Sequence, residues 1–455
     1  MQLLEKIYDE SPIFFQNIMV SVSGYQRNIN RYGKTYYDFL NFLSDFDTWP
    51  LERKFEYQRK ELVKFIKFAV SNSKFYQKLY KDIDIESIKD IDDLKRLPIV
   101  DKEMLRENIN DVVTISKKGA VEGHTGGTTG KSLVVLYTPE DMMKRMAMLD
   151  HFKARVGFLH RKMKRATFNG KHIVPPNQKK KVFWRYNAAC KQMIYSSFHI
   201  TEDNMKYYVD SLNKYKPQAI DGFFSCMCDI ANYIERHNIK LEFTPIAIFP
   251  TSETVTKAGR ELLERVFKCK VYDQYASSEG APFVTECKEQ VLHMELATGV
   301  FEHFEDGSDE ILVTSFMTHG TPLIRYRIGD SMSFDEGSIC KCGIESPIVK
   351  EIQGRRLDFL YTAEGAKINA VNVANLFKNI PNAIIRAQAV QEKMDEIIIK
   401  LEVDKNLYKP EYDMLLRDEF LHKFGEKTKI IIEHVDEIPR EKNGKFRLIK
   451  NNVGK

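Results

Sequence analysis

A segment rich in glycine and threonine is the first place where this sequence suggests chemistry. Residues 123–132 read GHTGGTTGKS, and the closing Gly-Lys-Ser is also the ending of a Walker-type phosphate loop. That loop needs a glycine where this chain has Thr125, and it needs a helix directly behind the phosphates. Residues 133–138 are instead β-branched and apolar without helical periodicity, which predicts strand–loop–strand. A phosphate-loop kinase or GTPase is therefore disfavoured.

The same segment can hold an anion in another way. Its glycines let backbone N–H groups approach a phosphate, its threonine hydroxyls can donate, and one lysine adds positive charge. A plain hairpin loop is the alternative. The candidate nucleotide-binding residues here are Thr125, Gly127, Thr128, Thr129, Gly130 and Lys131.

Cysteine and histidine are spaced as a possible metal site. Cys287 is followed by His293, and Cys340 and Cys342 come about fifty residues later. Three thiolates and one imidazole are a complete tetrahedral ligand set for structural zinc. The alternative is a group of buried cysteines with an unrelated histidine, which is the commoner fate of cytosolic cysteine.

Composition limits the possible classes of protein. A chain of 455 residues with 43% apolar and 29% charged residues is globular and long enough for two or three domains. A net charge of +5 on this length gives no argument for a nucleic-acid partner. The sequence has no apolar run of about 20 residues, no signal-peptide pattern and no evident disulfide framework. We expect a cytoplasmic protein without a membrane-spanning segment.

Periodicity indicates which elements carry these residues. Residues 1–118 are expected to be mostly helical, with residues 57–70 on one helix and Asp101 capping another. An apolar strand at 246–250, a helix at 256–267 and a strand at 270–275 predict a βαβ crossover and a parallel sheet.

The last hundred residues are expected to form a small α+β unit. Strands are predicted at 396–403 and 429–433, with a helix at 411–424 between them. The polar segment 353–358 precedes this unit and is the expected hinge.

Three further segments give the glycine-rich loop a context. They are residues 275–279 (YASSE), 326–330 (YRIGD) and 439–445 (PREKNGK). With residues 123–132, their order and spacing resemble the adenylate-forming superfamily. The closer resemblance is to its phenylacetate-CoA ligase-like branch, which includes CapK-type proteins encoded with capsular polysaccharide genes.

The resemblance covers nearly the whole chain and implies an α/β fold. It implies a large N-terminal α/β domain over 1–353, which begins with a helical region and binds ATP and the acyl substrate. A hinge at 354–358, with Asp358 at the pivot position, would then lead to a small mobile α+β domain over 359–455 that carries the catalytic lysine.

The resemblance also implies an AMP-forming ligase. A carboxylate would attack the α-phosphate of ATP to give an acyl-adenylate and pyrophosphate. The acyl group would then pass to the thiol of CoA, or alternatively to a sugar amine or hydroxyl in polysaccharide biosynthesis. A zinc-stabilised binding protein without catalysis is an alternative from another class.

The resemblance assigns roles to individual residues. Lys445 would bridge the carboxylate and the α-phosphate, and Glu279 would hold Mg²⁺. Tyr275 would stack on adenine, and Asp330 would accept hydrogen bonds from the ribose hydroxyls. Further candidates for contact with ATP or AMP are Ser252, Glu253, Ser278 and Arg355. The same branch resembles this chain at Cys287, His293, Cys340 and Cys342, which favours zinc there.

The acyl substrate is the least defined part of the prediction. Its pocket is expected between residues 195 and 280, with His199, Phe223 and Phe224 as candidates. Ordinary core positions would explain these three residues equally well.

Overall fold

The structure is a computed structural model, and it describes residues 2–124, 133–175, 178–305, 308–335, 337–355, 359–363, 365–377, 383–441 and 444–453. These residues cluster into two compact units. The first unit comprises residues 1–24, 161–271 and 353–455, and the second comprises residues 25–160 and 272–352. The domain boundaries predicted from sequence at 353 and 359 stay a prediction.

The N-terminal region is helical, as its sequence predicts. Asp101 caps a helix by accepting a hydrogen bond from the backbone nitrogen of Met104 at 2.9 Å. The helices are α1 (Gln2–Glu10), α2 (Ile13–Arg31), α3 (Lys34–Asp47), α4 (Leu51–Asn72), α5 (Lys74–Leu79), α6 (Lys102–Glu107) and α7 (Ile109–Val112), with short 3₁₀ turns at Ile85–Ser87 and Asp92–Arg96.

A six-stranded sheet forms the centre of the first unit, in the order β4-β5-β3-β6-β7-β8. All neighbouring strands are parallel except β4, which runs antiparallel to β5. The strands are β3 (Arg165–Asn169), β4 (Trp184–Asn187), β5 (Gln192–Ser196), β6 (Ala219–Phe223), β7 (Ala247–Thr251) and β8 (Lys270–Val271). Helices α9 (Glu202–Tyr215), α10 (Phe224–Arg236) and α11 (Lys257–Phe267) bury apolar side chains against it. The predicted βαβ crossover is confirmed as β7–α11–β8.

The single strand predicted at 270–275 is wrong. The chain forms β8 in the first unit and then β9 (Gln274–Tyr275), which belongs to the sheet of the second unit. The residues between them have other partners: the backbone nitrogen of Asp273 donates to the Glu286 carboxylate at 2.7 Å. Because β8 and β9 pair in different sheets, the segment predicted as one strand forms two.

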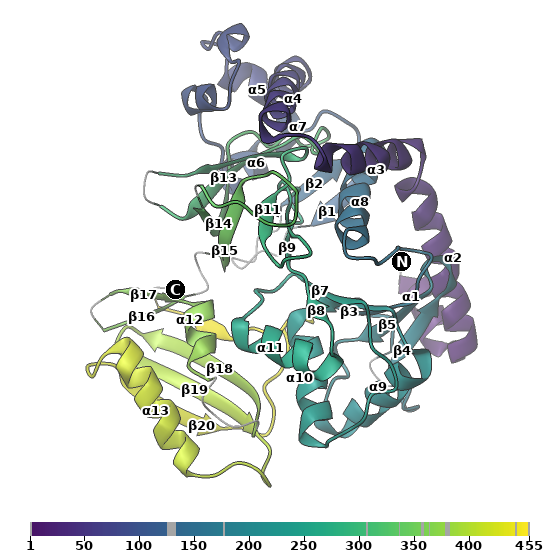
Figure 1. Ribbon diagram of the computed structural model, residues 1–455, viewed down its shortest axis with the longest axis vertical. Coiled ribbons are helices and arrows are strands. Elements are labelled where there is room, and N and C mark those ends of the chain that lie inside the picture. The colour runs from purple at the N-terminus through teal and green to yellow at the C-terminus, as the bar shows by residue number, and fades with distance from the viewer. Residues whose placement is uncertain are drawn as a thin grey trace. The chain divides into compact units, whose positions relative to one another are not determined.

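The C-terminal part of the first unit is a second sheet covered by a helix. Its four strands lie in the order β20-β19-β18-β21, and Leu416, Phe420 and Phe424 of α13 are buried against them (Figure 1). The predicted bounds of β19 and α13 agree with the structure. The elements are β16 (Phe359–Tyr361), β17 (Lys367–Asn369), α12 (Ala370–Asn375), β18 (Ile384–Lys393), β19 (Glu396–Val403), α13 (Glu411–Phe424), β20 (Lys429–His434) and β21 (Ile449–Asn451).

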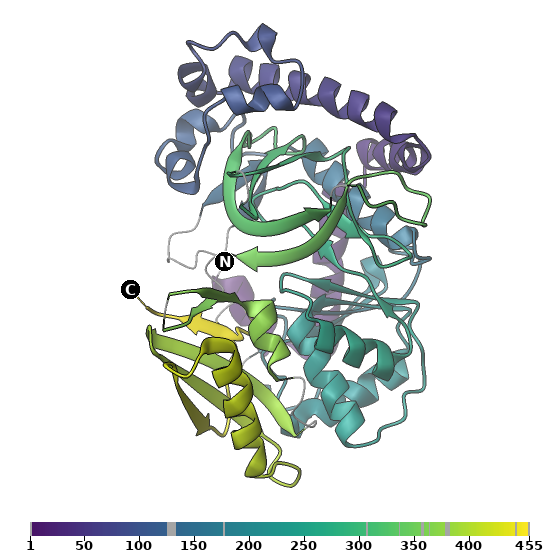
Figure 2. The ribbon, with the colours of Figure 1, turned by 60° about the vertical axis from the view of Figure 1, so that its left-hand side comes forward.

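The second unit is built on a seven-stranded sheet in the order β12-β13-β14-β15-β11-β10-β9. Its long strands β14 and β15 lie side by side as the curved green arrows of Figure 2. A separate hairpin pairs β1 with β2, and α8 follows it. The elements are β1 (Val121–His124), β2 (Val134–Tyr137), α8 (Pro139–Ala154), β10 (Val284–Glu286), β11 (Leu292–Met294), β12 (Gly299–His303), β13 (Glu310–Ser315), β14 (Tyr326–Asp335) and β15 (Ile348–Arg355).

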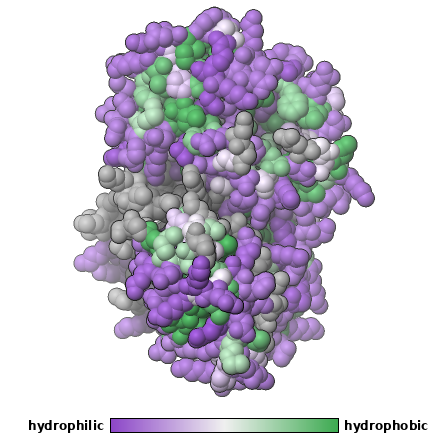
Figure 3. Space-filling view, turned by 90° about the vertical axis from the view of Figure 1, so that its left-hand side faces the viewer, coloured by the Kyte–Doolittle hydropathy of each residue, from purple (hydrophilic) through white to green (hydrophobic). Residues whose placement is uncertain are grey.

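The apolar core of the second unit joins the N-terminal helices to this sheet. Leu62, Phe65 and Ile66 of α4 pack in one buried cluster with Val313 of β13 and Tyr326 of β14. Hydrophilic side chains cover most of the face drawn in Figure 3, with smaller apolar patches between them. Within the described residues, none of the helices has the length and apolar character needed to span a bilayer.

Candidate active site

The glycine-rich loop lies between two paired strands. Residues 125–132, with the candidates Thr125, Gly127, Thr128, Thr129, Gly130 and Lys131, are outside the described residues. On either side, β1 and β2 pair antiparallel from Val121↔Tyr137 to His124↔Val134, which confirms the predicted strand–loop–strand. The Tyr137 hydroxyl donates to the Ser278 carbonyl at 2.7 Å, so the base of this hairpin contacts the turn that carries Glu279.

The turn at 277–281 holds Glu279 in a buried position. Glu279 is only 5% exposed, whereas the candidate Ser278 is exposed. The Ser277 hydroxyl accepts hydrogen bonds from the backbone nitrogens of Gly280 at 3.1 Å and Ala281 at 3.0 Å. Gly280 has a φ of +103°, and a Cβ there would lie 2.5 Å from Cγ2 of Thr318, so both its conformation and its surroundings favour glycine.

A buried arginine fixes this turn from beneath. Nη1 of Arg145, on α8, donates to the carbonyls of Gly280 and Ala281, both at 3.0 Å, and Nη2 reaches the Ser277 carbonyl at 3.3 Å. Its guanidinium lies 4.5 Å from the centre of the Phe283 ring, and burial lowers its pKa. Arg145 therefore both orients the turn and places positive charge beneath it. This role of Arg145 was not predicted from sequence, because its partners are backbone carbonyls and leave no motif.

Tyr275 and Asp330 are brought together. The Tyr275 hydroxyl donates to Oδ2 of Asp330 at 2.7 Å, which links β9 to β14 within the same sheet. The Tyr275 ring is 8% exposed and packs edge-on against Phe301. Two residues 55 positions apart thus meet, and the tyrosine orients the aspartate carboxylate.

Two further predicted residues, Arg355 and Asp358, lie at the expected hinge and are described only in part. Arg355 is the last residue of β15, and its side chain lies outside the described residues. The hinge candidate Asp358 also lies outside them.

In the first unit, Lys445 is held beside the turn that contains Ser252 and Glu253. Nζ of Lys445 donates to the Ser252 carbonyl at 3.1 Å, and the backbone nitrogen of Phe446 donates to Oε1 of Glu253 at 3.1 Å. Gly444 has a φ of +79°, and a Cβ there would lie 2.5 Å from the Ser197 hydroxyl. The sequence Gly444-Lys445 thus permits a tight turn that presents the lysine at the end of β7.

Glu253 contributes to this arrangement as an anchor. Its carboxylate also accepts from the backbone nitrogen of Ser225 at 2.7 Å and from the Ser225 hydroxyl at 3.0 Å. Burial raises the pKa of Glu253, while the hydrogen bonds from Ser225 and the charge of Arg440 act in the opposite direction. In this structure Glu253 connects the start of α10 to the lysine segment.

A buried ion network lies behind the lysine. Asp229, on α10, accepts from Arg440 Nη2 at 2.6 Å and from Arg386 Nε at 3.2 Å and Nη2 at 3.0 Å. Arg440 also donates to the Ser225 hydroxyl at 2.8 Å. Glu402 lies 3.6 Å from Nη1 of Arg386, so two arginines face two carboxylates, all 4 to 9% exposed, and their charges compensate one another away from water. Asp229 was missed from sequence, although an aspartate beside Ile230 on the apolar face of a helix was a usable signal.

The acyl-pocket candidates are packed side chains. Phe223 is 7% exposed and Phe224 is 6% exposed, and both belong to the apolar cluster of the first unit. Nδ1 of His199 lies 2.8 Å from the Ser196 hydroxyl, and its ring stacks on Phe183 at 5.3 Å between centres. Phe223 and Phe224 thus occupy core positions, whereas His199 is half-buried, and a role for the three residues in an acyl pocket stays a prediction.

The predicted zinc ligands lie together in the second unit. Candidate ligand atoms of Cys287, His293, Cys340 and Cys342 are all within 4.8 Å of one another. Cys287 follows β10 and His293 lies in β11, whereas the other two cysteines belong to the connection between β14 and β15. Cys287 and His293 are each 2% exposed.

The distances within this cluster suit a metal better than a disulfide. The sulfurs of Cys287 and Cys340 are 3.6 Å apart, and the sulfur of Cys342 is 3.5 Å from Nε2 of His293. Tetrahedral zinc with bonds of about 2.3 Å to sulfur and about 2.0 Å to nitrogen separates two sulfurs by roughly 3.8 Å and a sulfur from a nitrogen by roughly 3.5 Å. A disulfide would bring the sulfurs to about 2.05 Å. The residues therefore fit a four-ligand zinc site.

Comparison with known proteins identifies the family. Residues 360–452 match the family model described as the CapK C-terminal domain. The whole chain is similar to Protein CapK of Staphylococcus aureus, with 38% identity over 454 residues, which cover 99% of this chain and 100% of that protein. The chain belongs to the CapK family.

Solved structures similar to this CapK family member include ligases. Its similarity to 2-hydroxyisobutyryl-CoA ligase in the postadenylation state, in complex with 2-HIB-AMP, has a TM-score of 0.71 at 16% identity and covers 89% of this chain and 90% of that chain. With the same ligase in the thioesterification state, in complex with 2-HIB-AMP and CoA, the TM-score is 0.55 at 17% identity, over 90% and 91% of the two chains. The α/β fold predicted from sequence, that of an adenylate-forming enzyme, is confirmed.

Proposed function

We propose that this CapK family member is an AMP-forming carboxylate ligase. It would use Mg-ATP to convert a carboxylic acid into an acyl-adenylate, with release of pyrophosphate, and would then transfer the acyl group to an acceptor. The observation that carries the proposal is the position of Lys445, whose Nζ lies 3.1 Å from the Ser252 carbonyl at the end of a parallel strand. Loops at this end of a parallel sheet are where α/β proteins bind ligands.

The chemistry assigned to Lys445 follows from its charge. As the acid's oxygen attacks the α-phosphate, negative charge builds up on the phosphate oxygens. A compact ammonium group stabilises that charge more in the transition state than in the ground state. Anchors on both sides of the lysine, Gly444 against Ser197 and Phe446 on Glu253, reduce the reorganisation needed to reach that position.

The nucleotide would be bound by residues of the second unit. Asp330, oriented by the Tyr275 hydroxyl, has carboxylate oxygens suited to the ribose hydroxyls. Glu279 offers the oxygen ligands that Mg²⁺ prefers, and Arg145 holds the turn that carries it through hydrogen bonds to the carbonyls of Gly280 and Ala281. Magnesium bound there would neutralise charge on the phosphates.

For the acceptor we propose the thiol of CoA. Support comes from the fold shared with a ligase that has been solved with both 2-HIB-AMP and CoA. The alternative acceptor is a sugar amine or hydroxyl, a class suggested by the resemblance to CapK-type proteins. The two alternatives are distinguished by adding CoA or a sugar acceptor separately and measuring which of them supports AMP release over many turnovers.

The ligase proposal is tested by ATP–pyrophosphate exchange with a panel of carboxylic acids, with and without CoA. We expect exchange that depends on one class of acid and falls by at least about a hundredfold in Lys445→Ala, since one electrostatic contact to a developing charge contributes about 10²–10³. Lys423→Ala is the matched control, because Lys423 is an exposed lysine on α13. Absence of exchange with every acid, together with absence of AMP binding, would contradict the proposal.

We also propose that Cys287, His293, Cys340 and Cys342 hold a structural zinc ion. The geometric fit of three sulfurs and one nitrogen supports this. Four protein ligands leave no open position for substrate. Zinc would instead tie the β10–β11 hairpin to the connection that precedes β15.

A further inference from the structure

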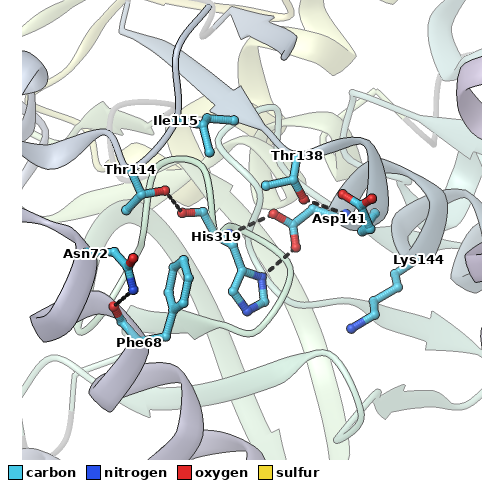
Figure 4. A pocket seen from close by; sticks show the side chains of 9 residues that line it. Phe68, Asn72, Thr114, Ile115, Thr138, Asp141, Lys144 and His319 are labelled. Atoms are coloured by element: carbon cyan, nitrogen blue, oxygen red, sulfur yellow. Dashed lines mark hydrogen bonds and ion pairs between the residues drawn. The ribbon is translucent and has the colours of Figure 1, made fainter. Parts of the chain in front are cut away.

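A cavity of about 410 Å³ lies in the second unit, apart from the residues assigned to the ligase reaction. Its wall is formed by the C-terminal end of α4, residues 114 and 115, the first turns of α8 and His319 (Figure 4). This volume is within the range of small-molecule sites. Nothing in the proposed reaction uses it.

One wall of the cavity is a histidine held in a single orientation. The backbone nitrogen of His319 donates to Oδ2 of Asp141 at 2.7 Å, and ring Nδ1 lies 2.7 Å from Oδ1 of the same carboxylate. The His319 carbonyl accepts from the Thr114 hydroxyl at 2.6 Å. The ring also contacts Phe65 and Phe68 edge-on, at 5.2 and 4.7 Å between centres.

This orientation leaves ring Nε2 available to a ligand. The carboxylate holds Nδ1 in its protonated form, and the imidazole side chain is 31% exposed while that of Asp141 is 2% exposed. A carboxylate–histidine pair of this kind presents one defined nitrogen to whatever binds beside it. Both oxygens of Asp141 accept hydrogen bonds from His319, which partly offsets the effect of this carboxylate on an anion in the cavity.

A lysine supplies positive charge at the same wall. Lys144 lies one turn after Asp141 on α8, and its side chain extends toward the His319 ring (Figure 4). In the part of the chain that the structure describes, the Lys144 ammonium has no carboxylate within 4.0 Å. Glu140 also lines the cavity, but it is exposed and solvated. The Lys144 ammonium favours a bound negative charge.

The part of the wall next to the His319 ring is less polar. The Phe68 ring and the Ile115 side chain face the cavity, and Asn72 places its amide beside them. Nδ2 of Asn72 donates to the Phe68 carbonyl at 2.8 Å, which leaves its Oδ1 as an acceptor. The cavity therefore combines a cationic edge with an apolar surface.

We propose that this cavity is a second ligand site, which binds a small organic oxyanion, a carboxylate or a phosphate monoester. The oxyanion accepts a hydrogen bond from Lys144 Nζ and lies beside His319 Nε2, and its apolar body packs against Phe68 and Ile115. The site is independent of the ligase reaction, because none of its residues is assigned to ATP or to acyl transfer.

The site is tested by histidine ring NMR on the full-length protein, without ATP. The chain has 11 histidines, and the spectrum of His319→Gln identifies the signal of His319 by its loss. Benzoate, phenyl phosphate and inorganic phosphate are titrated separately. We expect saturable movement of the His319 signal with benzoate or phenyl phosphate, and which of the two binds more tightly distinguishes a carboxylate from a phosphate ligand.

Two lysine variants make the test specific. Lys144→Met is expected to weaken binding at least about tenfold, the value of one charge-assisted hydrogen bond. Lys118→Met, which removes an exposed lysine outside the cavity lining, is expected to bind as the wild type does. Absence of saturable movement with all three anions, or unchanged affinity in Lys144→Met, would overturn the proposal. Equal affinity for inorganic phosphate and phenyl phosphate would overturn the role of the apolar wall.

Because the test contains no nucleotide, its outcome does not depend on the ligase proposal. If exchange is found, a consequence that rests on the proposed function can also be measured. Asp141 and Arg145 lie one turn apart on α8, and Arg145 holds the turn of Glu279. Saturating phenyl phosphate is then expected to change the Mg²⁺ concentration for half-maximal exchange by at least about twofold in wild type but not in Lys144→Met, and no change in wild type would refute this coupling.

Discussion

Replacing Asp229 with asparagine tests whether the buried ion network holds the lysine segment in place. Asp229→Asn keeps the shape of the side chain but removes the charge between Arg386 and Arg440. Removing one partner of a buried ion pair costs about 3–5 kcal/mol. We expect the lower end, about 3 kcal/mol, since the asparagine oxygen still accepts one hydrogen bond. Arg386 also keeps the Ile200 carbonyl at 2.9 Å, and Arg440 keeps the Ser225 hydroxyl.

The lost free energy should mainly weaken the packing of the segment that carries Lys445 against α10. A change of about 3 kcal/mol corresponds to roughly a hundredfold change in an equilibrium constant. We therefore expect amide hydrogen exchange in residues 437–441 and 444–449 to accelerate by up to about a hundredfold. The rate of ATP–pyrophosphate exchange should fall as well. Helix α13 packs against Ala387 and Ala389 of β18 and not against Arg386, so its amides should keep their protection from hydrogen exchange.

The same helix supplies a matched control. Glu235, also on α10, pairs with Arg265 at 2.7 Å, but the two side chains are 32% and 57% exposed. Because exposed pairs contribute at most about 1 kcal/mol, Glu235→Gln should change local protection less than about fivefold. If Asp229→Asn and Glu235→Gln have the same small effect, the buried network does not hold the lysine segment and this reasoning is wrong.

Three further outcomes are expected. Cys342→Ser should lose the zinc that we expect at one ion per chain by elemental analysis and should lower the melting temperature, whereas Cys269→Ser should keep the zinc; equal metal content in the two would count against the site. Arg145→Met should raise the Mg²⁺ concentration for half-maximal exchange more than Arg145→Lys does, because a lysine can still donate to a carbonyl of the Glu279 turn, and equal values would mean that these hydrogen bonds do not position the turn. Gly444→Ala should slow exchange at least about tenfold, because a Cβ meets the Ser197 hydroxyl at a positive φ, and wild-type rates would mean that the turn is not needed in this form.

Elements with a clear period were predictable from sequence. Helix α13 and strand β19 have the predicted bounds, because each has an apolar face with the period of its own secondary structure. The run 270–275 was not predictable by the same rule. Periodicity detects that a residue is apolar and extended, but it does not say which sheet the residue joins, and here Val271 and Gln274 pair in different sheets.

Motifs predicted contacts better than local patterns did. The cysteines at 340 and 342 meet Cys287 and His293 as predicted, although about fifty residues separate the two pairs. The motifs assigned Tyr275 and Asp330 separate roles, and the hydrogen bond between them was not predicted. The ion network and Arg145 were not predictable in this way. Their partners are backbone carbonyls or charged residues that come together only in the folded chain, and a single buried arginine leaves no spacing to detect.

Glu253 shows how one residue can satisfy a motif and still have another role. The resemblance places it near adenine, and the structure uses its carboxylate to join the start of α10 to the residue after Lys445. Burial raises the pKa of the Glu253 carboxyl group, and the hydrogen-bond donors around it act in the opposite direction. The ionised form of Glu253 therefore depends on those donors remaining in place. Separation of the lysine segment would remove the Phe446 nitrogen and the charge of Arg440 together, which would favour proton uptake by Glu253. The anchor of the lysine is therefore also a group whose ionisation depends on whether the lysine segment is docked.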